Sequence, residues 1–392
     1  MVCVAHGISH FFQLLLAPLF PWLKVAFNLS YAELGLIVSV FFVVSSVSQT
    51  VAGFVVDRIG GRNVLFAGLG LLGLAALLLS QAQNYAMLMA GAMLAGLGNS
   101  VFHPADFTLL NKRVSASRLS HAFSAHGISG NLGWAAAPVF LGTIAGLFGW
   151  RTALFAAGLV PLAILAVLFT YRDLLDTEEV KAAVAPAKKE QGHVLAFLRV
   201  PAVWMCMVFF LITAMAGSGI QNFSIPALGS LYDISLAWAT TCFTAYMLAS
   251  AAGMVCGGFL AAKTTRHERT IALALAAAGV MAWLTAAAIV PSMLTIILMA
   301  SIGFCSGLAG PSRDLLIRAA APKNATGRVY GVVYSGLDVG MAIAPILFGT
   351  VMDAGHPSWL FIGIGSFQMM AILTAMSVGT KNARNAVKAQ AA

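Results

Sequence analysis

Charged side chains are scarce in this chain of 392 residues, of which only 9% are Asp, Glu, Lys or Arg. A soluble domain carries about 25% charged residues, so this composition cannot supply a surface that faces water. Hydrophobic residues make up 60% of the chain. Because a protein core cannot take up so many apolar side chains, many of them must face lipid. The composition therefore excludes an ordinary soluble protein.

Cysteine is also rare, and the five cysteines all lie in apolar stretches without the spacing of a metal finger. We expect reduced thiols that pack as small hydrophobic residues. The sequence has no Walker or kinase motif and no paired nucleophile and base at a defined spacing. These absences argue against an enzyme and against a nucleotide-driven pump, and they imply no cofactor.

Basic residues outnumber acidic ones, 22 to 13, and the net charge is +9. The basic residues lie in short loops between apolar runs, which is typical of membrane topology rather than of nucleic-acid binding. If the N-terminus is cytoplasmic, all of the 22 except Lys24 and Arg151 fall on one face. The positive-inside rule then predicts that both termini are cytoplasmic, in what we expect to be a bacterial inner membrane.

Long hydrophobic runs dominate the chain, and a helix needs about 20 such residues to cross the hydrocarbon core. Backbone polar groups in lipid must be satisfied internally, so the runs predict helices, and they lack the alternation of a membrane barrel. The first run is too long for a signal peptide and is interpreted as the first span. The twelve predicted spans are 2–24, 31–56, 63–82, 84–110, 119–147, 151–171, 200–228, 236–261, 270–290, 292–318, 327–352 and 357–379.

The longest polar stretch, 172–199, divides the chain near its middle. It predicts an N-terminal six-helix bundle at 1–171, a cytoplasmic linker at 172–199, and a C-terminal six-helix bundle at 200–392 with a short cytoplasmic tail. A regulatory role for the linker is the alternative. We expect the chain to function as a monomer in the lipid bilayer.

The two halves repeat each other at a constant offset of 207 residues. Because each half has an even number of spans, both have the same orientation, as in parallel-repeat secondary transporters whose substrate site lies between the halves. A duplicated bundle with no transport role is the alternative. Small residues and a proline recur in spans five and eleven, which indicates close helix packing with a bend. The matched pairs are Gly96 and Gly303, Pro104 and Pro311, Gly133 and Gly340, Pro138 and Pro345, and Gly142 and Gly349.

The loop after span two carries a charged glycine motif whose members are Gly53, Asp57, Arg58, Gly60 and Arg62. On this motif and the repeat, the chain resembles the major facilitator superfamily over essentially its full length. The resemblance implies an all-α membrane protein of twelve helices in two six-helix repeats. It also implies that this loop is a cytoplasmic latch, in which Asp57 stabilises the outward-facing state. A tight charged turn that only fixes topology is the alternative.

Further motifs resemble the fosmidomycin-resistance-type branch of that superfamily: His10 to Gln13 with Pro18 and Pro21, Val101 to Asp106, and Gly130 to Gly133. The branch typically has Glu where Asp106 stands. Many proton-coupled drug antiporters carry an arginine in span four, where this chain has Ala92. The usual drug/proton antiport is therefore not implied.

Polar groups inside spans are expensive in lipid and indicate functional sites. By the resemblance, spans one, four, seven and ten line the central cavity. In span seven, Gly217, Gly219 and Pro226 predict a broken or bent helix. The predicted substrate-binding residues are His10, His103, Asn131, Gln221, Asn222, Arg313 and Asp338, and the candidates for proton coupling are His6, Asp106, His126 and Asp338.

Structural roles are the alternatives for the same groups. Asp106 and His103 could link to Arg113 or Arg313 near the cytoplasmic surface, and His126 could make a hydrogen bond between helices.

The sequence predicts a secondary active transporter that moves a small organic solute by alternating access, coupled to protons. Arg313 favours an anion or zwitterion because guanidinium grips carboxylates with paired hydrogen bonds, although its neighbour Asp314 could neutralise it. A divalent transition-metal transporter that uses His6, His10, His103 and Asp106 is one alternative. A receptor or scaffold without transport is another.

Overall fold

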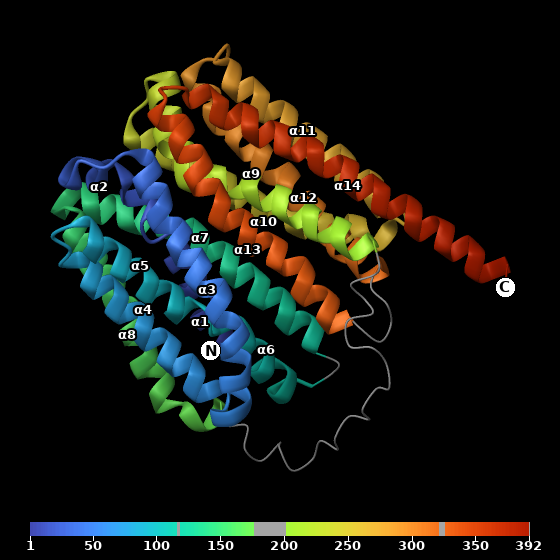
Figure 1. The fold of residues 1–392 in the computed structure, drawn as a ribbon, viewed down its shortest axis with the longest axis horizontal. Coiled ribbons are helices and arrows are strands. Elements are labelled where there is room, and N and C mark those ends of the chain that lie inside the picture. The colour runs from blue at the N-terminus through green and yellow to red at the C-terminus, as the bar shows by residue number, and fades with distance from the viewer. Residues whose placement is uncertain (116–117, 176–200, 321–325, 392) are drawn as a thin grey trace. The chain divides into compact units, whose positions relative to one another are not determined.

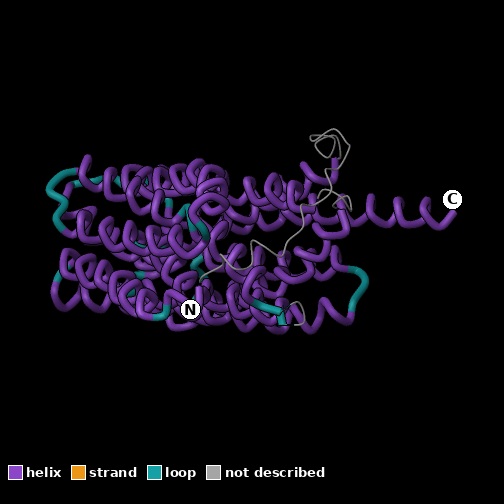
Figure 2. Tube along the Cα trace, turned by 90° about the horizontal axis from the view of Figure 1, so that it is seen from below, coloured by secondary structure: helices purple, strands orange, loops and turns teal. Residues whose placement is uncertain are grey.

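The computed structural model describes residues 1–115, 118–175, 201–320 and 326–391. Across these ranges the secondary structure is helical, as Figure 2 shows. Twelve helical segments in the described ranges are long and apolar enough to cross a membrane. The predicted all-α fold class with twelve spans is thereby confirmed.

The chain divides into two compact units, Met1–Lys189 and Glu190–Ala392. This division falls inside the predicted linker, of which only a short 3₁₀ helix, Arg172–Leu175, is described. The rest of the linker, from 176 to 199, lies outside the described residues.

In the described residues of the first unit, eight α-helices and the short 3₁₀ turn η1 together make six spans (Figure 1). Spans one and four are each split into two helices. These elements are α1 (Val2–Gln13), η1 (Ala17–Leu19), α2 (Phe20–Phe27), α3 (Tyr31–Ile59), α4 (Gly61–Ser80), α5 (Tyr85–Asn99), α6 (Phe102–Arg113), α7 (Leu119–Phe148) and α8 (Trp150–Thr170).

The second unit also supplies six spans, built from longer helices. Of the broken or bent helix predicted for span seven, the break is wrong, because α9 runs through Pro226 without interruption, and the bend stays a prediction. A proline removes a single hydrogen bond, which the remainder of a long helix tolerates in lipid. The elements are α9 (Pro201–Tyr232), α10 (Leu236–Lys263), α11 (His267–Ala287), η5 (Ser292–Leu294), α12 (Thr295–Ala320), α13 (Thr326–Asp353) and α14 (Pro357–Ala391).

Local sequence sets where several helices begin and end. Ser30 accepts from the Glu33 backbone N–H at 3.1 Å while the Glu33 carboxylate accepts from the Ser30 N–H at 2.8 Å, a reciprocal cap at the start of α3. Asn84 and Ser235 cap α5 and α10 through their side chains. Gly60 ends α3 at φ +85°, a backbone conformation that favours glycine.

Repeated glycines bring equivalent helices into backbone contact in each unit. In the first unit, a Cβ on Gly133 in α7 would collide with the backbone oxygen of Gly7 in α1. In the second unit, a Cβ on Gly340 in α13 would lie 2.5 Å from the backbone oxygen of Leu211 in α9. The first and fifth spans of each repeat therefore pack through the same glycine. Gly142, the second small residue of the motif in α7, has open space instead, so close packing there is not found.

Candidate functional site

Three helices of the first unit bring five ionisable side chains together. His6 and His10 lie one turn apart on α1, which packs against both α6 and α7. Helix α6 supplies His103 and Asp106, three residues apart, and α7 supplies His126. Residues spaced by three or four share one face of a helix, so each pair points the same way.

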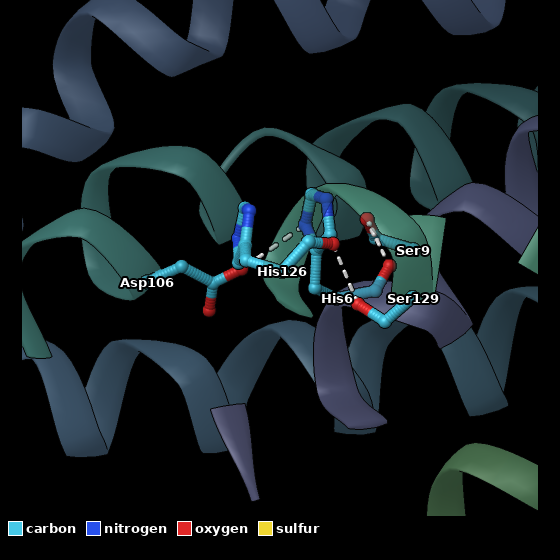
Figure 3. Close-up of polar contacts among 5 residues, drawn as sticks. All are labelled: His6, Ser9, Asp106, His126 and Ser129. Carbon is cyan, nitrogen blue, oxygen red and sulfur yellow. Dashed lines mark hydrogen bonds and ion pairs between the residues drawn. The ribbon is translucent and has the colours of Figure 1, made fainter. Parts of the chain in front are cut away.

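The centre of the cluster is the carboxylate of Asp106, whose side chain is 0% exposed. Its Oδ2 atom lies 3.1 Å from His126 Nε2 and 3.2 Å from His6 Nδ1 (Figure 3). His6 and His126 are 2% and 5% exposed. Oδ1 of Asp106 is buried without a hydrogen-bond partner. A buried carboxylate therefore depends on two imidazoles and keeps one oxygen unsatisfied, which is costly in a protein interior.

The two imidazoles beside Asp106 stack on each other, with ring centroids 3.4 Å apart and planes 20° from parallel. The hydroxyl of Ser9 donates to the His6 carbonyl at 3.0 Å, and that of Ser129 donates to the His126 carbonyl at 2.7 Å. Both serines bond to backbone, as Figure 3 shows, and leave the ring nitrogens to the carboxylate. The arrangement fixes the two rings on one side of Asp106.

A second layer of rings continues from this centre along α1. The His10 ring lies 4.4 Å from that of His6 and 4.3 Å from that of Trp134, whose Nε1 donates to Gln13 Oε1 at 3.1 Å. A Cβ on Gly130 would come within 2.8 Å of the His10 ring, so glycine makes room for it. No role was predicted for Trp134 from the sequence, where the nearest signals are two separate motifs, one containing Gln13 and the other containing Gly130.

His103 lies at the other edge of the cluster. Its ring stacks on Phe107 at 5.9 Å and lies 5.5 Å from that of His6. The alternative in which Asp106 links to Arg113 is wrong, because Asp106 pairs with histidines and Arg113 donates to the Asp173 carbonyl at 3.4 Å. The alternative for His126, a hydrogen bond between helices, is what the structure shows.

Two of the predicted site residues in the second unit have contacts within that unit. Arg313 Nε lies 3.0 Å from Asp314 Oδ1, and the guanidinium carbon lies 4.8 Å from the centroid of the Phe210 ring. The neutralisation of Arg313 by Asp314 that the sequence left open is therefore present. Asn222 uses its amide within α9, donating to the Ser218 carbonyl at 2.8 Å.

The remaining predicted site residues are buried or partly buried within spans. Asn131 is 9% exposed in α7, Gln221 is 9% exposed in α9, and Asp338 is partly buried in α13. The structure joins His6, His10, His103, Asp106 and His126 within the first unit. That the cluster meets Arg313 and Asp338 at a common cavity stays a prediction.

The predicted latch forms the turn between α3 and α4. Asp57 and Arg58 are exposed at the end of α3, and Gly60, with a φ of +85°, separates α3 from α4. Arg62 Nη1 donates to the Arg172 carbonyl at 3.5 Å. The geometry is that of a charged turn, and a latch function stays a prediction.

One set of side chains in the described ranges could hold a metal ion. The ligand atoms of His6, Asp106 and His126 all lie within 4.8 Å of one another. The sequence-based set for a metal included His10 and His103 in place of His126. In the structure His6 and His126 are the two histidines whose ring nitrogens pair with Asp106.

Comparisons with known proteins agree with the fold. The sequence model of the Major Facilitator Superfamily matches residues 2–345 and 216–391. The "Probable nitrate transporter NarT" of Staphylococcus aureus strains JH9 and Newman is 29% identical over 171 residues, which cover 43% of this chain and only 42% of those relatives.

A crystal structure of a bacterial homolog of the human lysosomal transporter Spinster, in an inward-facing and occupied conformation, has a TM-score of 0.74. It is 13% identical, and the match covers 98% of this chain and 95% of that one. At this identity the likeness shows the fold alone. The matching family and relatives are transporters rather than enzymes, which confirms the expectation that this chain is not an enzyme.

Proposed function

This chain belongs to the Major Facilitator Superfamily, and from that premise we propose that it is a secondary active transporter of a small organic anion or zwitterion. It works by alternating access between its two six-helix units and is driven by protons. The chain is a multi-pass membrane protein. In the proposal it lies in a bacterial inner membrane as a monomer with both termini cytoplasmic.

Ionisable side chains within the spans of both units are the observation that carries this proposal. His10 and His103 lie in spans one and four, and Arg313 and Asp338 lie in spans ten and eleven. An ionised side chain at the centre of a membrane helix costs roughly 2.5–3.5 kcal/mol, and such residues usually serve transport paths. A bundle with a purely structural role would gain nothing from ionisable side chains inside the spans of both halves.

The substrate class is supported by the charge pair in the second unit. Arg313 and Asp314, 3.0 Å apart, place a cation and an anion side by side on α12. Such a pair suits a zwitterionic solute that carries both a carboxylate and an ammonium. The relatives named as probable nitrate transporters also favour an anionic cargo.

We place proton coupling at Asp338, in the candidate span Ser335–Asp353. A carboxyl group inside a span can take up and release a proton as its surroundings change between wet and dry. In the same proposal Asp57, in the turn after α3, acts as the latch. The span-one and span-four motifs that include His10 and Asp106 support membership of the fosmidomycin-resistance-type branch.

Transport by purified protein tests the proposal. Proteoliposomes with an imposed pH gradient should accumulate at least one solute from a panel of amino acids, small carboxylates and nitrate, above the level in protein-free liposomes. His103→Ala should lower the initial rate about tenfold, the loss expected for one hydrogen bond of about 1.4 kcal/mol.

An exposed histidine outside the cluster, His356, supplies the control, because His356→Ala should transport at the wild-type rate. A wild-type rate in His103→Ala would remove that residue from the site. Failure of folded protein to accumulate any panel member would contradict the proposed substrate class.

A divalent transition metal is the second candidate for the cargo. It is favoured by the converging ligand atoms of His6, Asp106 and His126. Uptake of radioactive zinc into the same proteoliposomes, with no uptake of any organic solute or nitrate, would establish this candidate instead.

A further inference from the structure

The contacts around Asp106 have the spacing of a metal coordination shell. Zinc binds histidine nitrogen and carboxylate oxygen at about 2.0–2.2 Å in tetrahedral sites, which places neighbouring ligand atoms roughly 3.3 Å apart. The two measured separations from Asp106 Oδ2 are 3.1 Å to His126 and 3.2 Å to His6. Both separations are close to that value, and all three ligand atoms lie within 4.8 Å of one another.

Charge and burial at the cluster also favour a cation. The Asp106 carboxylate is fully buried, and its Oδ1 atom has no hydrogen-bond partner. The ion pairs that it makes are to two imidazoles, which carry charge only when protonated. A divalent cation would supply the missing counter-charge, and neutral imidazoles would ligate it directly.

From this geometry we propose that His6, Asp106 and His126 bind a divalent transition-metal ion of the zinc class, held as a resident ion within the first unit. Two imidazole nitrogens and one carboxylate oxygen suit zinc, cobalt or nickel, whereas magnesium and calcium prefer oxygen ligands. Three protein ligands leave a fourth tetrahedral position for water.

A resident ion would act on the packing of the first unit. Its ligands come from three different helices, α1, α6 and α7. It therefore ties span one to the second half of span four and to span five. All three ligands are buried, which is the environment of an ion that stays with the fold rather than one that exchanges at a mouth.

Zinc binding to the full-length protein in detergent, after removal of metals by a chelator, tests this proposal without any transport assay. Calorimetric titration with zinc chloride should give one site per chain, and zinc should raise the midpoint of thermal unfolding because it binds the folded state. Magnesium chloride should do neither. Cobalt in place of zinc should give the intense visible absorption of a tetrahedral site.

Variants then assign the ligands. Removing a residue that only contacts a metal ligand typically costs about 10–100-fold in metal affinity. His126→Gln and Asp106→Asn remove direct ligands, so each should weaken zinc binding at least about 100-fold. His356→Gln, outside the cluster, and His103→Ala, which impairs transport in the proposed function, should both keep wild-type affinity.

Several results would overturn the site. These are no zinc or cobalt binding to folded wild-type protein, wild-type affinity in both ligand variants, or zinc accumulation inside proteoliposomes, which would make the ion a cargo. If a ligand variant does not fold, the cobalt spectrum of the wild-type protein decides. The proposal does not rest on organic solute transport, because its readouts are binding and stability.

Discussion

Gly133→Ala should leave little folded protein in detergent, although it adds only one methyl group. The new Cβ would collide with the backbone oxygen of Gly7 and would lie 2.9 Å from its carbonyl carbon and 3.1 Å from the Phe11 nitrogen. Backbone atoms of α1 cannot turn aside as a side chain can, so the two helices must separate. Overpacking typically costs about 1–3 kcal/mol, and a backbone collision should fall at the upper end.

A second glycine of the same helix is the matched control. Gly142 also lies in α7, but a Cβ there would meet nothing within 4 Å. Gly142→Ala should therefore be neutral, or stabilising by up to about 1 kcal/mol because alanine favours the helix. Size-exclusion profiles and thermal unfolding of both variants measure the difference. Equal stability of the two variants would contradict the close α1–α7 contact.

Asp338→Asn should abolish solute accumulation driven by a pH gradient while leaving solute exchange intact. With one proton per solute, a gradient of one pH unit supports about tenfold accumulation, since one unit is worth about 1.36 kcal/mol. Asparagine cannot carry the proton, so this ratio should fall to about one. Exchange of labelled for unlabelled solute needs no net proton movement and should continue.

A control for the Asp338→Asn substitution is available in the loop between α9 and α10. Asp233 is exposed there with φ +50°, a conformation that asparagine tolerates well. Asp233→Asn should retain the full accumulation ratio. Wild-type accumulation by Asp338→Asn would move the coupling group elsewhere in the chain.

The helical spans were predictable because their signal is local. Each is a continuous apolar run bounded by polar or turn residues, and the predicted 63–82 and 236–261 correspond to Gly61–Ser80 and Leu236–Lys263. The role of Gly133 and Gly340 as contact points also followed from the sequence, since small residues at matching places in a repeat indicate helix packing. The same reasoning failed at Gly142, because the pattern does not say which side of the helix meets a neighbour.

The interruptions of spans one and four were not predicted. Span one passes through a 3₁₀ turn at Ala17–Leu19, where Pro18 lacks a backbone N–H, and span four is interrupted between Asn99 and Phe102. Val2–Phe27 and Tyr85–Arg113 each contain an 18-residue window with a mean hydropathy typical of a membrane span, so a window average does not register the breaks. The second break starts a new helix at Phe102, and this helix carries both His103 and Asp106.

The meeting of His126 with Asp106 could not be read from the chain either. The two residues are 20 positions apart on different helices, and their contact depends on how α6 and α7 are rotated. Neither α6 nor α7 has a pronounced amphipathic pattern from which to infer that rotation. The sequence could therefore place His6 and His10 on one face, but not choose which histidines surround the carboxylate.

Distances between spin labels on the two units test alternating access most directly, and they need no knowledge of the substrate. In a protein whose five cysteines are replaced by serine, one label pair would join two exposed sites, Asn63→Cys in the first turn of α4 and Thr265→Cys in the turn after α10. The other pair would join exposed sites at the opposite ends of the spans, Gln83→Cys and Ile289→Cys.

We expect each label pair to show two distance populations in lipid. When the population of one pair shifts toward its longer distance, the population of the other pair should shift toward its shorter distance. This is the behaviour of two rigid six-helix units that open alternately to either side of the membrane. A single, unchanging distance distribution at both ends, across pH values and in the presence of the solute panel, would contradict the transporter account.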